Sequence, residues 1–132
     1  VNKETFTVTG VDWPTRDGSG IRDFIHVWDL AQAHVAALEH FDEATANQPY
    51  QVFNIGTGNG VTVKELAASF EKITGDPLKV QFGDPRPGDV AGVYTVSTKA
   101  RDVLGWQAEL TETDAVRDAI AWLPVRKEKL GY

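Results

Sequence analysis

Gly83-Asp84-Pro85-Arg86-Pro87-Gly88-Asp89-Val90 is the most informative stretch of this sequence. Its prolines and glycines cannot continue a helix or a central strand, so the stretch predicts a loop. Pro87 stiffens the backbone after Arg86, and Gly88 permits a turn that a Cβ atom would block. A stiff loop that presents a guanidinium group suits a phosphate, because the guanidinium binds two oxygens at once. The alternative is a solvated loop with a surface ion pair between Arg86 and Asp89.

A second glycine-rich stretch, Gly18-Ser19-Gly20-Ile21-Arg22-Asp23-Phe24-Ile25-His26-Val27, carries another arginine. Arg22 follows two glycines and precedes an apolar run. Two arginines on separate loops, each beside a glycine, would suit one diphosphate, because each guanidinium can bind one phosphate group. The alternative is that Arg22 pairs with Asp17 or Asp23. The sequence alone does not bring Arg22 and Arg86 together.

Composition and charge limit the class of protein. With 132 residues and 42% hydrophobic content, the chain suits one folded domain or one lobe of a larger protein. Its net charge of −6 argues against general binding to nucleic acid or to an anionic membrane. The sequence has no cysteine, and no apolar run approaches the roughly 18 residues of a membrane span. We therefore expect no nucleic-acid or membrane partner and a cytoplasmic location. The start lacks a methionine and runs directly into a strand-like segment, which leads us to expect a fragment.

Hydrophobic periodicity predicts short strands that alternate with helices. Strands are expected at 6–9, 24–28, 50–55, 79–82 and 93–96. Helices are expected at 30–43 behind an Asp29 N-cap, from the Thr62 capping box to Gly75, from Ser97 to Leu104, and from Thr111 to Pro124 before a frayed tail at 125–132. This alternation is typical of the α/β or α+β class. The strands are too few and too short for a complete doubly wound sheet, so we expect the chain to pack against a part that it lacks.

Catalytic and cofactor motifs find little support in the chain. Gly56, Gly58 and Gly60 lie between a predicted strand and a helix, but their spacing and the position of the next acidic residue do not fit a dinucleotide fingerprint. Tight turns and close approach of the backbone explain these glycines better. The three histidines lack the spacing of metal ligands, and no serine elbow, Walker loop or Tyr-x-x-x-Lys pair is present. We therefore assign no catalytic, cofactor-binding or metal-binding residue to this chain.

Taken together, the motifs resemble those of the UDP-glucose 4-epimerases, which are extended short-chain dehydrogenase/reductases. The resemblance rests on four stretches in order: Asp17 to Ala31 with Arg-Asp-Phe-Ile-His-Val, Phe53 to Gly58, Arg86 to Ala91 with Arg-Pro-Gly-Asp-Val, and Lys99 to Trp106. Their order and spacing hold from about Phe6 to Trp122. Because only the last part of such an enzyme is covered, the resemblance implies a C-terminal, UDP-sugar-binding lobe spanning residues 1–132, with the N-terminal NAD-binding domain absent.

The resemblance also implies roles for particular residues. Arg22 and Arg86 would hold the UDP diphosphate, and Asp89 would accept a hydrogen bond from the uridine ribose. Thr7-Val8-Thr9 would lie along the uracil; the family often has an aromatic at the last of these positions, where threonine offers no stacking face. Val93 would wall the sugar pocket. A small residue there is associated in the family with N-acetylated sugars, and valine is intermediate in size, so dual specificity is a hypothesis.

On this resemblance the intact enzyme would be an isomerase of galactose metabolism that interconverts UDP-glucose and UDP-galactose with NAD. The missing N-terminal half would bind NAD, and this chain alone would be inactive because the NAD loop and the catalytic Tyr and Lys are absent. Two alternatives stay open: another nucleotide-sugar epimerase or dehydratase of the same superfamily, and a non-catalytic UDP-binding remnant. Without its partner half, the chain would expose the apolar faces of 30–43 and 50–55, so we expect self-association.

Overall fold

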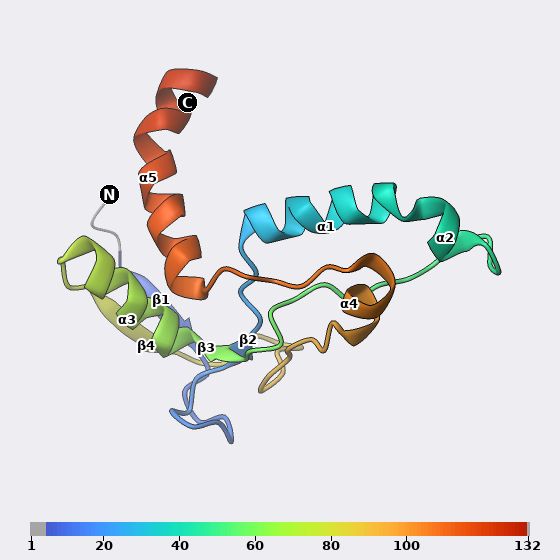
Figure 1. Cartoon of the computed structure of the whole chain (residues 1–132). Helices are drawn as coiled ribbons and strands as arrows, with labels where there is room; N and C mark the ends of the chain where they lie inside the picture. The colour runs from blue at the N-terminus through green and yellow to red at the C-terminus, as the bar shows by residue number, and fades with distance from the viewer. Residues whose placement is uncertain (1–4, 132) are drawn as a thin grey trace.

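The computed structural model describes residues 5–131 and has a mixed α/β architecture (Figure 1). In chain order its elements are β1 (Phe6–Thr9), β2 (Ile21–Arg22), α1 (Val27–Glu39), α2 (Phe41–Thr45), β3 (Val61–Thr62), α3 (Val63–Thr74), β4 (Val80–Gly83), α4 (Thr98–Leu104) and α5 (Glu112–Leu130). The strands that we expected at 6–9 and 79–82 are confirmed as β1 and β4, the second shifted by one residue.

The strands form two small sheets rather than one large one. β1 and β4 pair in parallel, with Thr9 opposite Gly83, and β2 and β3 pair antiparallel. Helices α3 and α5 pack against each other beside the β1–β4 sheet (Figure 1). Because β1 and β4 run in the same direction, their carboxyl ends meet at one edge of the sheet. The loops at 10–20 and 84–89 both begin at this edge.

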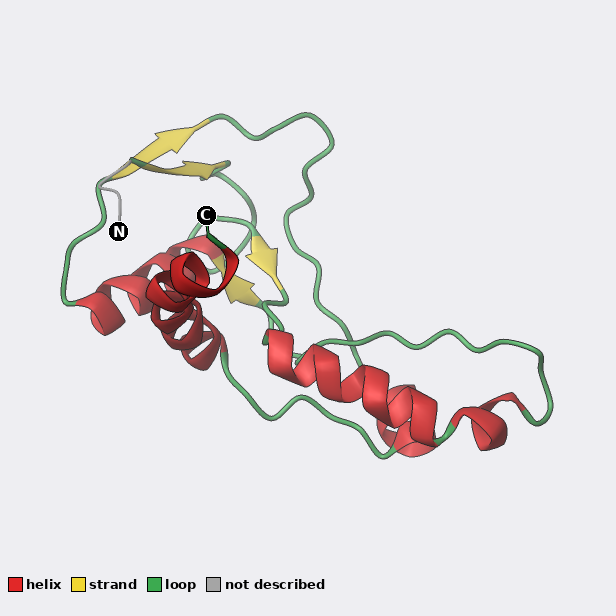
Figure 2. Ribbon diagram, turned by 90° about the horizontal axis from the view of Figure 1, so that it is seen from above, coloured by secondary structure: helices red, strands yellow, loops and turns green. Residues whose placement is uncertain are grey.

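The buried core lies between α1 and α4. Ala33 of α1 packs with Ala100, Leu104 and Trp106, and each of these side chains is less than a tenth exposed. The indole Nε1 of Trp106 donates a 3.0 Å hydrogen bond to the carbonyl oxygen of Asp29. Seen from above, α1, α2 and α4 form a group beside the one that contains α3, α5 and the strands (Figure 2). The core is small because the helices meet through alanines.

Local signals place the ends of α3 and α4 as expected, although the hydroxyl of Ser97 makes no capping hydrogen bond. Thr62 and Glu65 form the capping box of α3, in which the Thr62 hydroxyl accepts from the Glu65 amide and the Glu65 carboxylate accepts from the Thr62 amide. Gly75 ends α3 at a φ of 72°, which is the left-handed region that glycine adopts without strain. Ser97 precedes α4, and Gly105 ends it at a φ of 64°.

The expected strand at 24–28 and the expected Asp29 N-cap are wrong. Helix α1 begins at Val27 and its N-cap is His26, whose Nδ1 accepts a 2.9 Å hydrogen bond from the amide of Trp28. Asp29 lies in the first turn, where its carboxylate accepts from the amides at 109 and 110 instead. Histidine is not among the usual capping residues, so composition favoured the aspartate. Residues 23–26 have no strand partner within the described chain and stay irregular.

Two helices also end at other residues than expected. The helix predicted over 30–43 breaks at His40, which separates α1 from α2. In the other direction, α5 runs through Pro124 to Leu130, so Pro124 does not end it and 125–130 are helical rather than frayed. Proline removes one hydrogen bond to the preceding turn, but the turns on both sides keep theirs. Residue 132 of the expected tail lies outside the described residues.

The segments at 50–55 and 93–96 are not strands. Neither pairs along a ladder within the described residues, although Phe53 and Ile55 pack against the core. A strand needs a neighbouring strand edge for its amides and carbonyls, and the periodicity of a sequence does not reveal whether such an edge exists. The amide that would extend a ladder at Thr95 is taken by a side chain, as described below.

Large apolar side chains are exposed on α1, at the start of α2 and along 50–55. Leu38 and Phe41 are 76% and 57% exposed, and Tyr50 and Val52 are 73% and 66% exposed. The exposure that we expected for these two segments is therefore present, while the self-association derived from it stays a prediction. Among the helices of residues 5–131, none is both long enough and apolar enough to cross a membrane.

Candidate functional site

Arg22 and Arg86, which lie 64 positions apart in the sequence, meet at the carboxylate of Asp89. Nη2 of Arg22 lies 3.8 Å from Oδ1 of Asp89, and Nε of Arg86 lies 3.1 Å from Oδ2. Arg22 therefore pairs with Asp89 and not with Asp17 or Asp23, whose carboxylates accept hydrogen bonds from other donors. The structure therefore joins the two arginines that the sequence analysis singled out.

The loop at 84–89 is closed locally and attached to β2. The amide of Asp89 donates to the carbonyl of Arg86 at 3.0 Å, and Gly88 inside this turn has a φ of 85°. This positive φ confirms the need for glycine at that position. From the other side, Nη1 of Arg22 donates to the carbonyl of Val90 at 3.1 Å and to that of Ile21 at 2.7 Å. Arg22 is therefore fixed by the backbone, whereas Arg86 is held only by its neighbour in the same loop.

The two guanidinium groups differ in their access to solvent. The side chain of Arg86 is 69% exposed and that of Arg22 is 33% exposed, while the Asp89 carboxyl between them is 17% exposed. The hydrogen bond from Arg86, with a further contribution from the charge of Arg22, lowers the pKa of Asp89 below its ordinary value. The carboxylate thus stays ionised and pre-organises both cations. Their remaining N–H groups can receive a second anion from the solvent side.

Thr7-Val8-Thr9 lies on β1, and its three residues differ in their exposure to solvent. Val8 is fully buried, backbone included, whereas Thr7 is exposed and Thr9 is partly exposed. The hydroxyl of Thr7 accepts a 2.7 Å hydrogen bond from the side-chain amide of Gln81 on β4. The amide that follows Thr9, at Gly10, donates to the carbonyl of Gly83 at 2.9 Å. The carboxyl end of β1 is therefore tied to the start of the loop that carries Arg86.

Val93 lies next to β2 and its side chain is 56% exposed. Its amide donates to the carbonyl of Ile21 at 3.1 Å, and Gly92 forms a single parallel bridge with the same residue. The backbone of Val93 is therefore held by Ile21, which directly precedes Arg22 on β2. All of the residues that the resemblance implied lie on β1, β2 or the segment from Arg86 to Val93.

The sequence analysis did not identify the role of two partly buried carboxylates, Asp17 and Asp23, each of which accepts several hydrogen bonds in this region. Asp17 accepts from the amide and hydroxyl of Ser19 and from the hydroxyl of Thr62. Asp23 accepts from Thr57, Gly58 and Thr95. The contact from Asp17 to the residue two positions on is a local turn pattern that could have been recognised. The donors to Asp23 lie 34 to 72 positions away, so no local signal marks them.

Gly56 and Gly60 are needed for close packing, and Gly58 for its positive φ of 79°. A Cβ atom on Gly56 would lie 2.5 Å from a carboxylate oxygen of Asp23, and one on Gly60 would lie 2.5 Å from Cγ2 of Ile21. The backbone of Gly56 also exchanges two hydrogen bonds with the hydroxyl of Ser97. The protein's own atoms therefore occupy the space beside Gly56 and Gly60.

The stability of the chain at low pH tests whether the carboxylates of Asp17 and Asp23 stabilise the fold. Burial by itself would raise the pKa of Asp17 and of Asp23, but their hydrogen bonds outweigh it and lower both pKa values. Each carboxylate therefore adds stability that is complete above about pH 4, the pKa of a free aspartate, and is lost as the pH falls through the lower folded-state pKa. We expect the free energy of unfolding in urea to fall in acid and to fall less steeply in Asp17→Asn and Asp23→Asn. Asp42→Asn on the surface of α2 is the control, and equal slopes in all variants would contradict the assignment.

The sequence and the fold match one class of enzyme. A model of the NAD dependent epimerase/dehydratase family matches residues 2–56. The mixed α/β fold confirms the expected class, because it matches extended short-chain dehydrogenase/reductases over about a third of their length. Among solved structures, UDP-glucose 4-epimerase of Bifidobacterium longum in complex with NAD+ and UDP superposes with a TM-score of 0.82 at 40% identity, over 94% of this chain and 35% of that one.

The relatives found by sequence comparison narrow the class of enzyme further. The homologues of the chain are UDP-glucose 4-epimerases. It is 43% identical over 115 residues to the UDP-glucose 4-epimerase of B. longum, which covers 87% of this chain and 33% of that enzyme. It is 42% identical over 119 residues to the Bacillus subtilis enzyme, covering 90% of this chain and 34% of the relative. The chain thus spans about a third of the length of these curated relatives. The resemblance stated from the motifs is confirmed.

Proposed function

We propose that the chain forms the C-terminal, UDP-binding part of an NAD-dependent UDP-hexose 4-epimerase. The observation that carries this proposal is the convergence of Arg22 on β2 and Arg86 in the loop after β4 on the one carboxylate of Asp89. Two guanidinium groups at one place supply the bidentate donors that a diphosphate needs. The expected roles in galactose metabolism and in the cytoplasm go with this proposal, as does UDP-glucose or UDP-galactose as the ligand.

In this proposal each site residue has a defined part. Arg22, held by the backbone, supplies the fixed donor to the diphosphate, and the exposed Arg86 adjusts its position to the second phosphate group. Asp89 keeps both guanidinium groups oriented and offers an outward oxygen to the uridine ribose. Thr7 and Thr9, on either side of the buried Val8, lie along the uracil, and Val93 lies at the sugar. The contribution of these residues is binding energy and orientation, which place the sugar for a reaction elsewhere in the enzyme.

NAD and the catalytic groups would come from a part of the enzyme outside these residues. When bound there, NAD would take up and return a hydride at the sugar. The spacing of the glycines at 56–60 does not fit a dinucleotide fingerprint. We therefore propose that residues 1–132 alone bind the nucleotide without turning it over. The second candidate, another nucleotide-sugar epimerase or dehydratase, would share this site and differ in the sugar or in the reaction.

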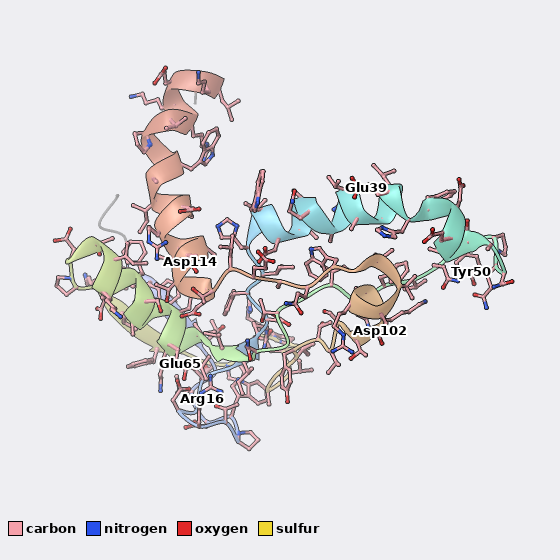
Figure 3. All side chains as sticks on the ribbon, in the orientation of Figure 1. Arg16, Glu39, Tyr50, Glu65, Asp102 and Asp114 are labelled. Carbon is pink, nitrogen blue, oxygen red and sulfur yellow. The ribbon has the colours of Figure 1, made fainter. Side chains whose placement is uncertain are left out.

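A calorimetric titration of UDP into the chain tests the proposal, with Arg86→Ala as the variant. We expect the substitution to weaken UDP binding by about 2 kcal/mol, roughly 30-fold, which is the scale of a lost charge-assisted contact. Arg101→Ala is the matched control, because Arg101 is similarly exposed and pairs with the neighbouring Asp102 on α4 (Figure 3). A folded wild-type chain that does not bind UDP, or an Arg86→Ala chain that binds as tightly as wild type, would overturn the proposal.

A further inference from the structure

Ile21 holds the segment from Ala91 to Val93 through the backbone. Its amide donates to the carbonyl of Ala91 at 2.9 Å, and its carbonyl accepts from the amide of Val93 at 3.1 Å. These two hydrogen bonds are the pair that a parallel bridge to Gly92 requires. If the ladder continued, the next amide along the segment, that of Thr95, would donate to the backbone carbonyl of Asp23.

The ladder stops after this single bridge, and a side chain supplies the next contact. The amide of Thr95 donates to Oδ2 of Asp23 at 3.0 Å. The backbone of this segment is therefore held at two points, the amide of Val93 and the amide of Thr95. Its side chain remains more than half exposed. The backbone of Val93 is thus fixed while its methyl groups face outward.

The Asp23 carboxylate is itself held from the opposite side. Oδ1 accepts from the amide and the hydroxyl of Thr57 at 2.9 and 2.6 Å, and Oδ2 also accepts from the amide of Gly58 at 3.3 Å. Gly56 leaves room for it, because a Cβ atom there would lie 2.5 Å from Oδ2. Four donors from two segments fix the direction of the carboxylate. The group therefore links the loop at 56–58 to the segment that carries Val93.

Arg22, the last residue of β2, and Asp23, which follows it, contact different parts of the site. Arg22 reaches Asp89 and the carbonyl of Val90, and Asp23 reaches Thr95. The contacts to the arginines and the contacts around Val93 can therefore be altered separately.

We infer that Asp23 is a positioning residue that sets the place of Val93 and thereby the fit of the sugar, while leaving the nucleotide diphosphate to the arginines. The inference rests on the proposed UDP-sugar site and adds to it a residue that touches no ligand. Only an ionised carboxylate suits the position, because all four surrounding groups are donors. Asparagine in its place would direct an amide N–H₂ group toward other N–H groups and could satisfy only one side of the link.

Titrations of UDP and UDP-glucose into wild-type chain and Asp23→Asn test this inference. We expect the variant to bind UDP within about twofold of wild type and UDP-glucose about tenfold more weakly, a loss equal to one hydrogen-bonded contact. Amide exchange measured by NMR should rise at Thr95 and Val93. In the Val93→Ala background the substitution at Asp23 should no longer change the ratio of the two affinities, because the positioned side chain is gone.

Asp17→Asn is the matched control, since Asp17 is also an aspartate held by several donors but lies against Thr62 and Ser19. It should leave the ratio of the UDP and UDP-glucose affinities unchanged. If Asp23→Asn does not fold, Thr57→Val removes one donor and should give a smaller shift in the same direction, about threefold. An unchanged affinity ratio with intact UDP binding would overturn the inference alone. A wild-type chain that binds no UDP would overturn the proposed function and this inference with it.

Discussion

Arg22→Ala is expected to weaken UDP binding at least about 100-fold, more than any other single substitution at the site. Arg22 is the half-buried member of the pair, and its guanidinium also bonds to the carbonyls of Ile21 and Val90. Its removal takes away a charged donor to the diphosphate and one attachment of the loop at 84–89. It also leaves Asp89 facing a single cation. Calorimetry with UDP measures the loss of affinity, and a thermal melt shows whether the chain stays folded.

Two further variants separate charge from position at Arg22. Arg22→Lys keeps the positive charge but loses the planar fork, so its affinity for UDP should fall between those of wild type and Arg22→Ala. Arg16→Ala is the matched control, because Arg16 likewise bonds to a carboxylate, that of Glu65, and to a backbone carbonyl, that of Gly60. Arg16 and Glu65 lie together beneath the start of α3 (Figure 3). Arg22→Ala and Arg16→Ala chains with equal affinity for UDP would contradict the assigned role.

Trp106→Ala is expected to cause the largest loss of stability, about 3–5 kcal/mol in the free energy of unfolding. The side chain is 5% exposed and fills the core between α1 and α4. The substitution leaves a cavity among alanines that cannot close it, and it removes the hydrogen bond to the carbonyl of Asp29. Since a domain of this size has a total stability of about 5–15 kcal/mol, a large part of the native population would be lost. Urea unfolding followed by circular dichroism measures the change.

The same substitution at Trp122 provides the comparison. Trp122 on α5 is 45% exposed, so Trp122→Ala removes less buried surface and should cost less than about 1 kcal/mol. Both variants remove one indole, which makes the difference between them a measure of burial. Similar losses at Trp106 and Trp122 would show that the core between α1 and α4 does not carry the stability of the chain.

Features determined by neighbours in the sequence were predictable. The capping box at Thr62, the glycine ends of α3 and α4, and the loop around Arg86 each depend on contacts within about four residues. Gly88 adopts the positive φ that its turn requires. The errors arose where a residue contacts a partner that is distant in the sequence instead of the neighbour that the local pattern predicts. Asp29 is a good N-cap by composition, but the amides at 109 and 110 occupy its carboxylate and His26 caps the helix instead.

The fold class, the ends of α3 and α4, the start of α5 and the two arginines that an anion would need could be predicted from the amino-acid sequence, because backbone geometry and charge are properties of short segments. Only the tertiary structure decided that Arg22 and Arg86 share Asp89, and that Asp23 replaces a backbone carbonyl at Thr95. The physical reason is the separation of these partners along the chain. Arg22 and Val90 lie 68 positions apart and Asp23 and Thr95 lie 72 apart, so their contacts exist only after the loops have been brought together by folding.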